Sequence, residues 1–413
     1  MAQEIDRRTF LAGALTVSAA SAMPRALRPA TTRPRTQEAR SGAAAASSAD
    51  LGTLVLITLY GGNDGLNTVI PIGDPAYASQ RGAVAIAPDK VLSLGNGFGL
   101  NPSLTGLKAV WDADQLAIVR GVSYPNASLS HFQSMDIWQS ASLTGDVSSG
   151  WLGRWLDRSG SDVLQACSIG PTVLPAMAGD RRTAAALQDT TQPQGQLPQA
   201  DAHFLSYYHE LQRPFPGESR LEADAAQAGV NMLKVSKDAA DAMRTQAPLT
   251  YPSDVGDLGT QLGVVSELIR AGLPTRAYAV TQGGYDTHSG ELETQNRNLA
   301  QLDGALSGFM ASIAGSPRGR NTTVLVYTEF GRRVQPNASD GTDHGTANNV
   351  LVLGPVVHGG LYGEAPSLTN LDENGNLIFT TDFRSVYATL LEGVLNFESK
   401  SVLGKSYPTL GFA

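Results

Sequence analysis

The chain is poor in several residue types, and each shortage excludes a class of protein. Its 413 residues include one cysteine, Cys167, so no intramolecular disulfide can form and a disulfide-stapled domain is excluded. Charged residues make up 16% and aromatic residues 7%, but hydrophobic residues reach 42%, which is typical of a globular protein with a sizeable core. We therefore expect a folded chain in which Cys167, within an apolar run, is a buried small hydrophobe.

Basic charge and long apolar runs are also missing. The net charge is −8, and without residues 1–50 the chain keeps 23 basic and 34 acidic residues, a net charge of −11. A protein this acidic lacks the basic surface that nucleic acid requires, so nucleic acid is not an expected partner. The longest apolar stretch is far shorter than the roughly 20 residues that a transmembrane helix needs, so no stable membrane span is expected.

The first 50 residues read as an export signal and a linker. Residues 1–22 contain Asp6-Arg7-Arg8-Thr9-Phe10-Leu11, an apolar stretch and then Ala20-Ser21-Ala22, a pattern that resembles a twin-arginine signal peptide. This predicts the twin-arginine translocation machinery as a partner and a periplasmic or extracellular location. Residues 23–50 have three prolines, five arginines and no periodic apolar face, which indicates a disordered linker.

Residues 51–413 alternate strand and helix patterns. An apolar run at 51–60 ends in a Gly-Gly turn, helical spacing follows at 102–112, and a second apolar run covers 116–122, which together indicate a βαβ unit. Further helix patterns lie at 128–138, 254–272, 291–314 and 382–391, with strand patterns at 277–281, 323–328 and 350–353. The sequence predicts an α/β domain over 51–413 with a mostly parallel central sheet, helices on both faces and a helical insertion at 198–245.

Side chains able to bind a metal ion lie at four turns beside the predicted strands. They are Asp64, Asp286, His288, Glu329, Asp343 and His344. In an open α/β sheet, ligands bind beyond the carboxyl ends of the strands, so groups from distant parts of the chain can converge there. Carboxylates and neutral imidazoles hold divalent cations, which predicts a site for one or two ions of Zn, Ca, Mg or Mn. For each residue taken alone, the alternative is an ordinary turn former.

Four more residues are candidates for substrate chemistry. Ser130 lies at the start of the predicted helix, as a nucleophile or a helix N-cap, and His131 is a ligand, a general acid or base, or a helix-start residue. Arg332 and Arg333 follow the turn at Glu329, either to hold an anionic ester by bidentate hydrogen bonds or as a solvated surface pair.

As a set these motifs resemble a family of exported bacterial proteins of unknown function, placed in the alkaline phosphatase and sulfatase superfamily. The resemblance covers 51 to about 405 and rests on Leu54 to Asp64, Ser130-His131-Phe132, Gly283 to His288, Thr328 to Arg332, and Thr342 to Gly345. It implies an alkaline-phosphatase-like fold, Ser130 as nucleophile, and metal ligands at Asp64, Asp286, His288, Glu329 and His344.

The chain departs from the superfamily at three points, one of which is an Asp286 to His288 spacing shorter than the usual one. Glu329 precedes Phe330 where the superfamily pairs an Asp with a His, so a complete two-metal site is not implied. Neither Ser128, Ser130 nor Cys167 is followed by x-Pro-x-Arg, so a formylglycine sulfatase is not expected. The leading hypothesis is an exported metal-dependent hydrolase of phosphate or sulfate esters. The alternatives are a catalytically degenerate binding or assembly protein that retains the fold, and a phosphotransferase or mutase of the superfamily.

Overall fold

The computed structural model describes residues 51–145, 147–160, 162, 164–187, 237–242, 244–246 and 255–413. The predicted signal peptide at 1–22 and linker at 23–50 lie outside these residues. Most of the predicted insertion at 198–245 also lies outside them; of its described part, residues 237–242 are helical.

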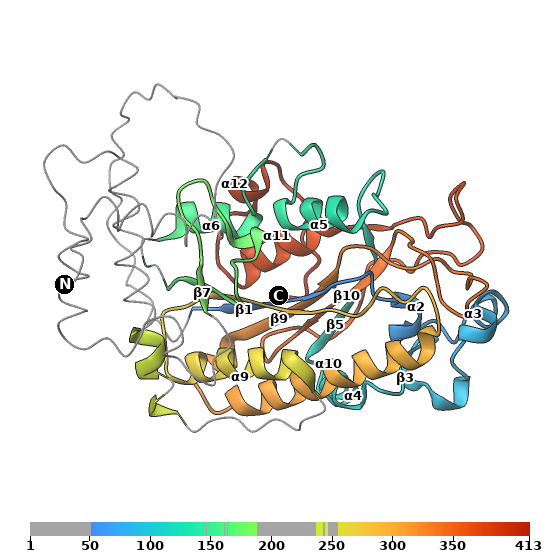
Figure 1. The fold of residues 1–413 in the computed structure, drawn as a ribbon, viewed down its shortest axis with the longest axis horizontal. Coiled ribbons are helices and arrows are strands. Elements are labelled where there is room, and N and C mark those ends of the chain that lie inside the picture. The colour runs from blue at the N-terminus through green and yellow to red at the C-terminus, as the bar shows by residue number, and fades with distance from the viewer. Residues whose placement is uncertain are drawn as a thin grey trace, which may run out of the picture.

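A mixed sheet forms the centre of the molecule, in the order β11-β5-β10-β9-β1-β8-β6-β7 with β12 paired to β5 (Figure 1). Its strands are β1 (Thr53–Leu59), β5 (Leu116–Ser123), β6 (Ala166–Ile169), β7 (Ala185–Leu187), β8 (Ala277–Gln282), β9 (Thr322–Thr328), β10 (Asn348–Leu353), β11 (Gly360–Tyr362) and β12 (Thr381–Asp382). A second, antiparallel sheet has the order β2-β4-β3, from β2 (Val69–Ile70), β3 (Leu92–Gly95) and β4 (Phe98–Leu100).

The apolar runs of the sequence become the buried middle of the main sheet. β1 lies between β8 and β9, is parallel to both, and has every residue buried. Side chains alternate across the sheet, so Leu54 and Leu56 enter one hydrophobic cluster while Val55 and Ile57 enter the other. A strand buried on both faces explains the continuous apolar run at 51–60.

Helices cover both faces of the sheet (Figure 1). They are α2 (Gly65–Thr68), α3 (Pro75–Arg81), α4 (Thr105–Asp112), α5 (His131–Ser140), α6 (Trp151–Ser159), α9 (Gly256–Arg270), α10 (Glu291–Ile313), α11 (Phe383–Gly393) and α12 (Ser399–Leu403). Helices α5, α6, α11 and α12 lie on one face, and α4, α9 and α10 on the other. The predicted fold class, an α/β protein with a mostly parallel sheet covered by helices on both faces, is confirmed. Among the described helices, none is both long and apolar enough to cross a membrane.

One antiparallel strand decides which residues meet at the edge of the sheet. β10 runs antiparallel to β9 and to β5. Its first residue, Asn348, therefore lies at the edge where β1, β8 and β9 end. The loop before β10 and the loops after those three strands share this edge, which brings together segments up to about 290 residues apart in sequence.

Candidate metal centre

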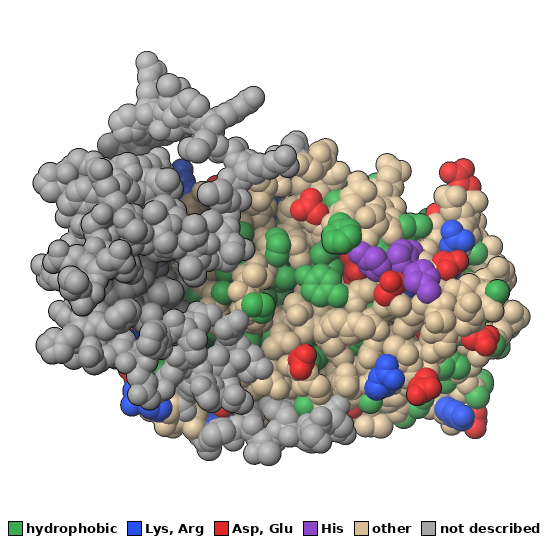
Figure 2. Space-filling model, viewed as in Figure 1, with side chains coloured by type: hydrophobic (Ala, Val, Ile, Leu, Met, Phe, Trp, Pro, Cys, Tyr) green, Lys and Arg blue, Asp and Glu red, His purple; other side chains and the backbone are tan. Residues whose placement is uncertain are grey.

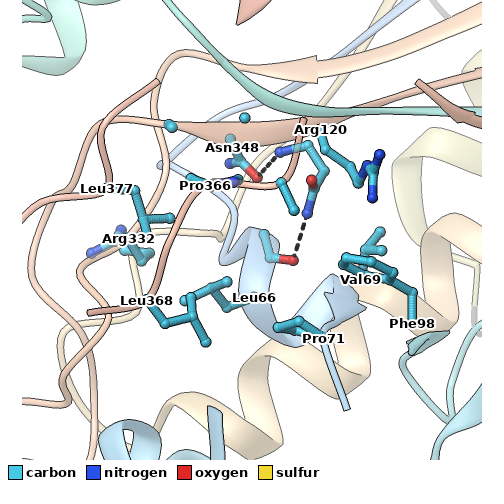
Figure 3. Close-up of a pocket in the computed structure, with 15 residues that line it drawn as sticks. Leu66, Val69, Pro71, Phe98, Arg120, Arg332, Asn348, Pro366, Leu368 and Leu377 are labelled. Carbon is cyan, nitrogen blue, oxygen red and sulfur yellow. Dashed lines mark hydrogen bonds between the residues drawn. The ribbon is translucent and has the colours of Figure 1, made fainter. Parts of the chain in front are cut away.

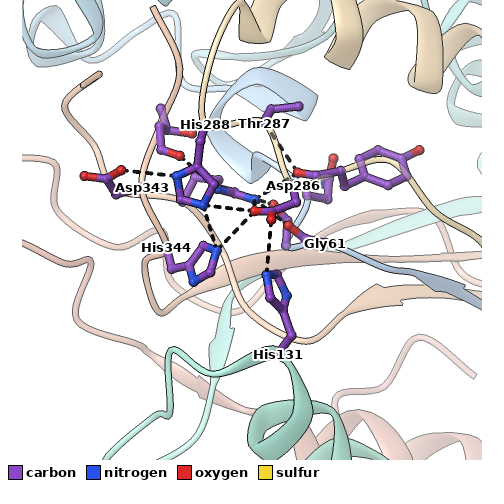
Figure 4. A network of polar contacts seen from close by, with 12 residues as sticks. Gly61, His131, Asp286, Thr287, His288, Asp343 and His344 are labelled. Atoms are coloured by element: carbon purple, nitrogen blue, oxygen red, sulfur yellow. Dashed lines mark hydrogen bonds and ion pairs between the residues drawn. The ribbon is translucent and has the colours of Figure 1, made fainter. Parts of the chain in front are cut away.

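Three histidines from three separate parts of the chain surround the carboxylate of Asp286 (Figure 4). Asp286 follows β8, and its Oδ1 lies 3.0 Å from Nε2 of His288 and 3.1 Å from Nε2 of His344. Its Oδ2 lies 3.6 Å from Nε2 of His131, the first residue of α5. The Nε2 atoms of His288 and His344 are 3.0 Å apart. All three rings thus point the same nitrogen at one carboxylate.

Each ring is held by an acceptor at its other nitrogen. The Nδ1 atom of His131 lies 2.8 Å from Oε1 of Glu329, and Nδ1 of His344 lies 2.8 Å from the carbonyl oxygen of Leu129. An acceptor at Nδ1 keeps the proton of a neutral imidazole there and leaves the Nε2 lone pair unprotonated, as in metal-bound histidines.

The third ring follows the same pattern. Nδ1 of His288 lies 3.2 Å from Oδ1 of Asp343. The hydrogen bond from Asn337 and the neighbouring His288 lower the pKa of Asp343. Asp343, predicted as a ligand, thus lies behind His288. A cation bound by both Nε2 atoms would lie between the rings of His288 and His344.

Four of the distances among the donor atoms are close to those around a single metal ion. Zinc bonds of 2.0–2.1 Å place the donors of a tetrahedral site about 3.3–3.4 Å apart. The contacts among the four side chains are 3.0, 3.0, 3.1 and 3.6 Å. Ligand atoms of His131, Asp286 and His344 also lie within 4.8 Å of one another, which marks these three as a possible metal site. His288 is not part of this group of three, but its Nε2 lies 3.0 Å from both Asp286 and His344. Three imidazoles with one carboxylate suit zinc or a similar transition metal better than calcium or magnesium.

Arg332 fixes Asp286 from beneath. The Nη2 atom of Arg332 donates to Oδ1 of Asp286 at 2.7 Å, and the guanidinium is fully buried. Its other hydrogen bonds go to the carbonyl oxygens of Gly61, Gly62, Tyr285 and Thr342. Partial burial raises the pKa of Asp286, but the hydrogen bond and the charge of Arg332 outweigh it and lower that pKa to about 2. Asp286 is therefore ionised, as a ligand must be.

This placement differs from the substrate-binding role that the sequence suggests for Arg332. All three of its guanidinium nitrogens donate within the protein, so none is directed at a solvent-borne anion. Arg332 also lines a pocket of about 440 Å³, part of it open to solvent, whose side chains are mainly apolar (Figure 3). No histidine of the centre lines this pocket. Arg333 is half-buried, and its backbone N–H donates to the carbonyl oxygen of Asp343 at 3.0 Å.

Glu329 lies behind His131. It is 1% exposed and accepts hydrogen bonds from the backbone N–H of Gly61 at 2.9 Å and from Thr328 Oγ1 at 2.7 Å. Gly61 has a φ of 117°, and a Cβ atom there would lie 2.4 Å from the backbone nitrogen of Asp286. The glycine after β1 thus lets the loops after β1 and β8 touch, with Glu329 bonded to both Gly61 and His131.

Asp64 lies apart from the four donors. It is fully buried, accepts from the backbone N–H of Leu66 as the N-cap of α2, and forms an ion pair with Arg81. Nη2 of Arg81 also lies 3.3 Å from Oε1 of Glu291. Burial and the nearby Asp64 raise the pKa of Glu291 to about 9. Where the sequence predicts a metal ion beside Asp64, the structure has a guanidinium.

Ser130 is exposed at the start of α5, and its side chain makes no capping hydrogen bond. Both of its neighbours touch the centre, Leu129 through its carbonyl oxygen and His131 through its ring. The sequence analysis missed the carbonyl of Leu129, and also Phe330, whose ring centroid lies 4.8 Å from that of His131 and 4.6 Å from that of His344. The residue that breaks the expected Asp-His pair thus packs against two of the histidines.

Comparisons with known proteins give a family and several distant folds. A family model described as "Protein of unknown function (DUF1501)" matches residues 116–393, and no curated protein matches the chain. The zinc complex of the C-terminal periplasmic domain of EcEptC from Escherichia coli is similar over 75% of this chain and 74% of that chain, with 10% identity and a TM-score of 0.37. A protein in the alkaline phosphatase superfamily from Vibrio parahaemolyticus is similar over 98% and 80%, with 11% identity and a TM-score of 0.39. A 2-O GAG sulfatase is similar over 87% and 72%, with 12% identity and a TM-score of 0.34.

Proposed function

The chain belongs to the family described as "Protein of unknown function (DUF1501)", and we propose that it is an exported metal-dependent hydrolase of phosphate or sulfate esters. The observation that carries the proposal is the arrangement of His131, His288 and His344. Each ring has an acceptor at Nδ1 and directs Nε2 at Asp286. Three histidines that direct the same nitrogen at one carboxylate, each with an acceptor at its other nitrogen, are arranged to bind a cation.

We assign one ion to this centre, held by the three Nε2 atoms and the carboxylate of Asp286. When bound, such an ion supplies Lewis-acid stabilisation of charge on the ester. The donors are partly open to solvent, from 22% exposure of the His344 side chain to 50% for Asp286, so a substrate can reach them. Asp343, Glu329 and the Leu129 carbonyl orient the rings, and Arg332 holds Asp286.

Ser130 is the proposed nucleophile. It is exposed and its side chain makes no capping bond, so its hydroxyl is available to a bound ester. Its position at the start of a ten-residue helix favours negative charge on the oxygen, because the helix dipole is positive there. We assign His131, the next residue, as a ligand through Nε2, which lies 3.6 Å from Oδ2 of Asp286; an Nε2 lone pair bound to the ion is not available as a general base. We also propose that the protein is exported by the twin-arginine route, and this part of the proposal rests on the Arg7-Arg8 pattern alone.

A second function has specific support. With the four protein donors assigned here, the ion would have a complete tetrahedral shell, and closed zinc sites are usually structural. Arg332, one of the two residues that the sequence suggests for anion binding, donates all three of its guanidinium nitrogens to groups inside the protein. Both observations favour a binding or assembly protein that retains the fold and one structural ion.

Metal analysis of the purified protein tests the centre. We expect about one equivalent of zinc or another transition metal, lost in His131→Ala and His344→Ala. His358→Ala is the matched control, because His358 is exposed and lies outside the cluster. Metal-free wild-type protein with an intact fold, unable to take up added zinc, rejects the centre and the function built on it.

A substrate screen separates the two functions. Ser130→Ala should keep its metal and lose hydrolysis of phosphate monoesters, phosphate diesters or sulfate esters. A metal-loaded wild-type protein that hydrolyses none of these classes supports the binding or assembly protein instead.

A further inference from the structure

One aromatic ring is exposed beside the metal centre. Phe132 is 91% exposed, while the only other large hydrophobic side chains exposed in the described part of the chain, Val356 and Ile378, reach 42% and 44%. Phe132 lies on the first turn of α5, directly after His131. In the space-filling view, hydrophobic side chains lie beside the purple histidine group on the same face (Figure 2). A single exposed apolar residue is ordinary on a protein surface, but this one adjoins a ligand of the centre.

Two arginines of the protein, Arg332 and Arg81, are bonded to other groups of the protein. The guanidinium of Arg332 donates hydrogen bonds to Asp286 and to four backbone carbonyls. Arg81 is fully buried against Asp64 and Glu291. In the proposed function the anionic end of the ester meets the metal ion, which does not distinguish one organic group from another.

We propose that Phe132 determines specificity by packing against the organic group of the substrate, and that the preferred esters carry a flat apolar face, such as an aryl or a sugar ring. The inference rests on the proposed function, because it places the ester at the ion. The proposal places the organic group of an ester held beside Asp286 over the start of α5, where Ser130, His131 and Phe132 follow one another. Covering that ring removes apolar surface from water and allows stacking.

Binding of two phosphonates to the zinc-loaded protein tests this without requiring turnover. Phenylphosphonate and methylphosphonate share the anionic head and differ only in the flat face. We expect the wild type to bind the phenyl compound about tenfold more tightly, which corresponds to one aromatic contact of about 1.4 kcal/mol. Phe132→Ala should lose this preference by weakening the phenyl compound alone, and Phe132→Trp should restore it.

Ile378→Ala is the control, because it removes an exposed hydrophobic side chain that is not next to a ligand in sequence. A glucosyl phosphonate added to the series shows whether a sugar ring is accepted in place of the aryl ring. If the wild type shows no preference for the phenyl compound, or if Phe132→Ala weakens both phosphonates equally, the inference is overturned.

Turnover separates this inference from the proposed function. With phenyl phosphate as substrate, Phe132→Ala should raise KM about tenfold and leave kcat and zinc content unchanged. A protein that binds phenylphosphonate through Phe132 but hydrolyses no ester overturns the proposed hydrolase and leaves the aryl site standing. A protein that hydrolyses esters with no change in Phe132→Ala does the reverse.

Discussion

Replacing Glu329 by glutamine tests whether the outer hydrogen bonds set the protonation form of the metal centre. The carboxylate accepts from three donors: the backbone N–H of Gly61, Thr328 Oγ1 and His131 Nδ1, at 2.9, 2.7 and 2.8 Å. Glutamine keeps a similar shape but offers one acceptor oxygen and adds an N–H₂ donor. At least one of the three donors then faces another donor inside the protein.

The ring of His131 is the partner able to adapt, since its proton can move between its nitrogens. If the amide N–H₂ faces Nδ1, that nitrogen must accept, the proton moves to Nε2, and the lone pair directed at Asp286 is lost. Removing an outer partner of a metal-bound histidine typically weakens metal binding about 10- to 100-fold, or about 1.4–2.7 kcal/mol. We expect zinc affinity of Glu329→Gln to fall within this range.

Competition with a chromophoric chelator measures zinc affinity, and circular dichroism checks the fold. Glu373→Gln is the control, because Glu373 is exposed and its replacement removes the same charge. Unchanged zinc affinity in a folded Glu329→Gln protein would refute the idea that Glu329 fixes the tautomer of His131.

Three further predictions concern the residues beneath the centre. Burial and Asp64 raise the pKa of Glu291 to about 9, so the folded protein keeps a proton that the unfolded chain releases above about pH 4.5. The stability of the folded protein should therefore fall as the pH rises between these two values. Glu291→Gln should raise the melting temperature more at pH 8 than at pH 5. A lower melting temperature of the variant at pH 8 would show that Arg81 needs an ionised Glu291. Gly61→Ala should cost at least about 1–3 kcal/mol from its φ of 117° alone, measured by urea unfolding, and an unchanged midpoint contradicts the contact between the two loops. Arg332→Lys should lower the free energy of unfolding by at least about 2 kcal/mol in the same assay. A lysine cannot reach all the acceptors that Arg332 binds, and each acceptor left unpaired costs about 1–3 kcal/mol. Equal stability of the variant would show that those carbonyls need no guanidinium.

Apolar runs and turns predicted the frame of the site. The run at 51–60 contains β1, the runs at 277–281 and 323–328 coincide closely with β8 and β9, and the pattern at 382–391 contains most of α11, with Asp382 as its N-cap. These patterns are readable because a buried strand needs apolar side chains on both faces and a helix start needs a capping acceptor. Cys167 is buried in β6, as its apolar surroundings indicate.

Strand direction was the part that local patterns could not supply. Asp343 and His344 precede a strand, whereas Asp286 and His288 follow one. They meet because β10 is antiparallel to its neighbours, which brings its start to the edge where β8 and β9 end. A run such as Val350 to Leu353 has the same composition in either direction, so only the pairing in the sheet determines this.

The role of each carboxylate depends on the nearest cation or N–H, and that partner is usually distant in sequence. Asp286 faces three Nε2 atoms, whereas Glu329 contacts the other ring nitrogen of His131, Nδ1. Asp64 follows β1 just as Asp286 follows β8, but Arg81 of α3 supplies its positive charge. A second metal ion beside Asp64 would have to displace this buried guanidinium and leave it unpaired, at a cost of about 3–5 kcal/mol for a broken buried pair. The pairing of Asp64 with Arg81, together with Phe330 in place of a ligand histidine, therefore favours a single ion at the histidine centre.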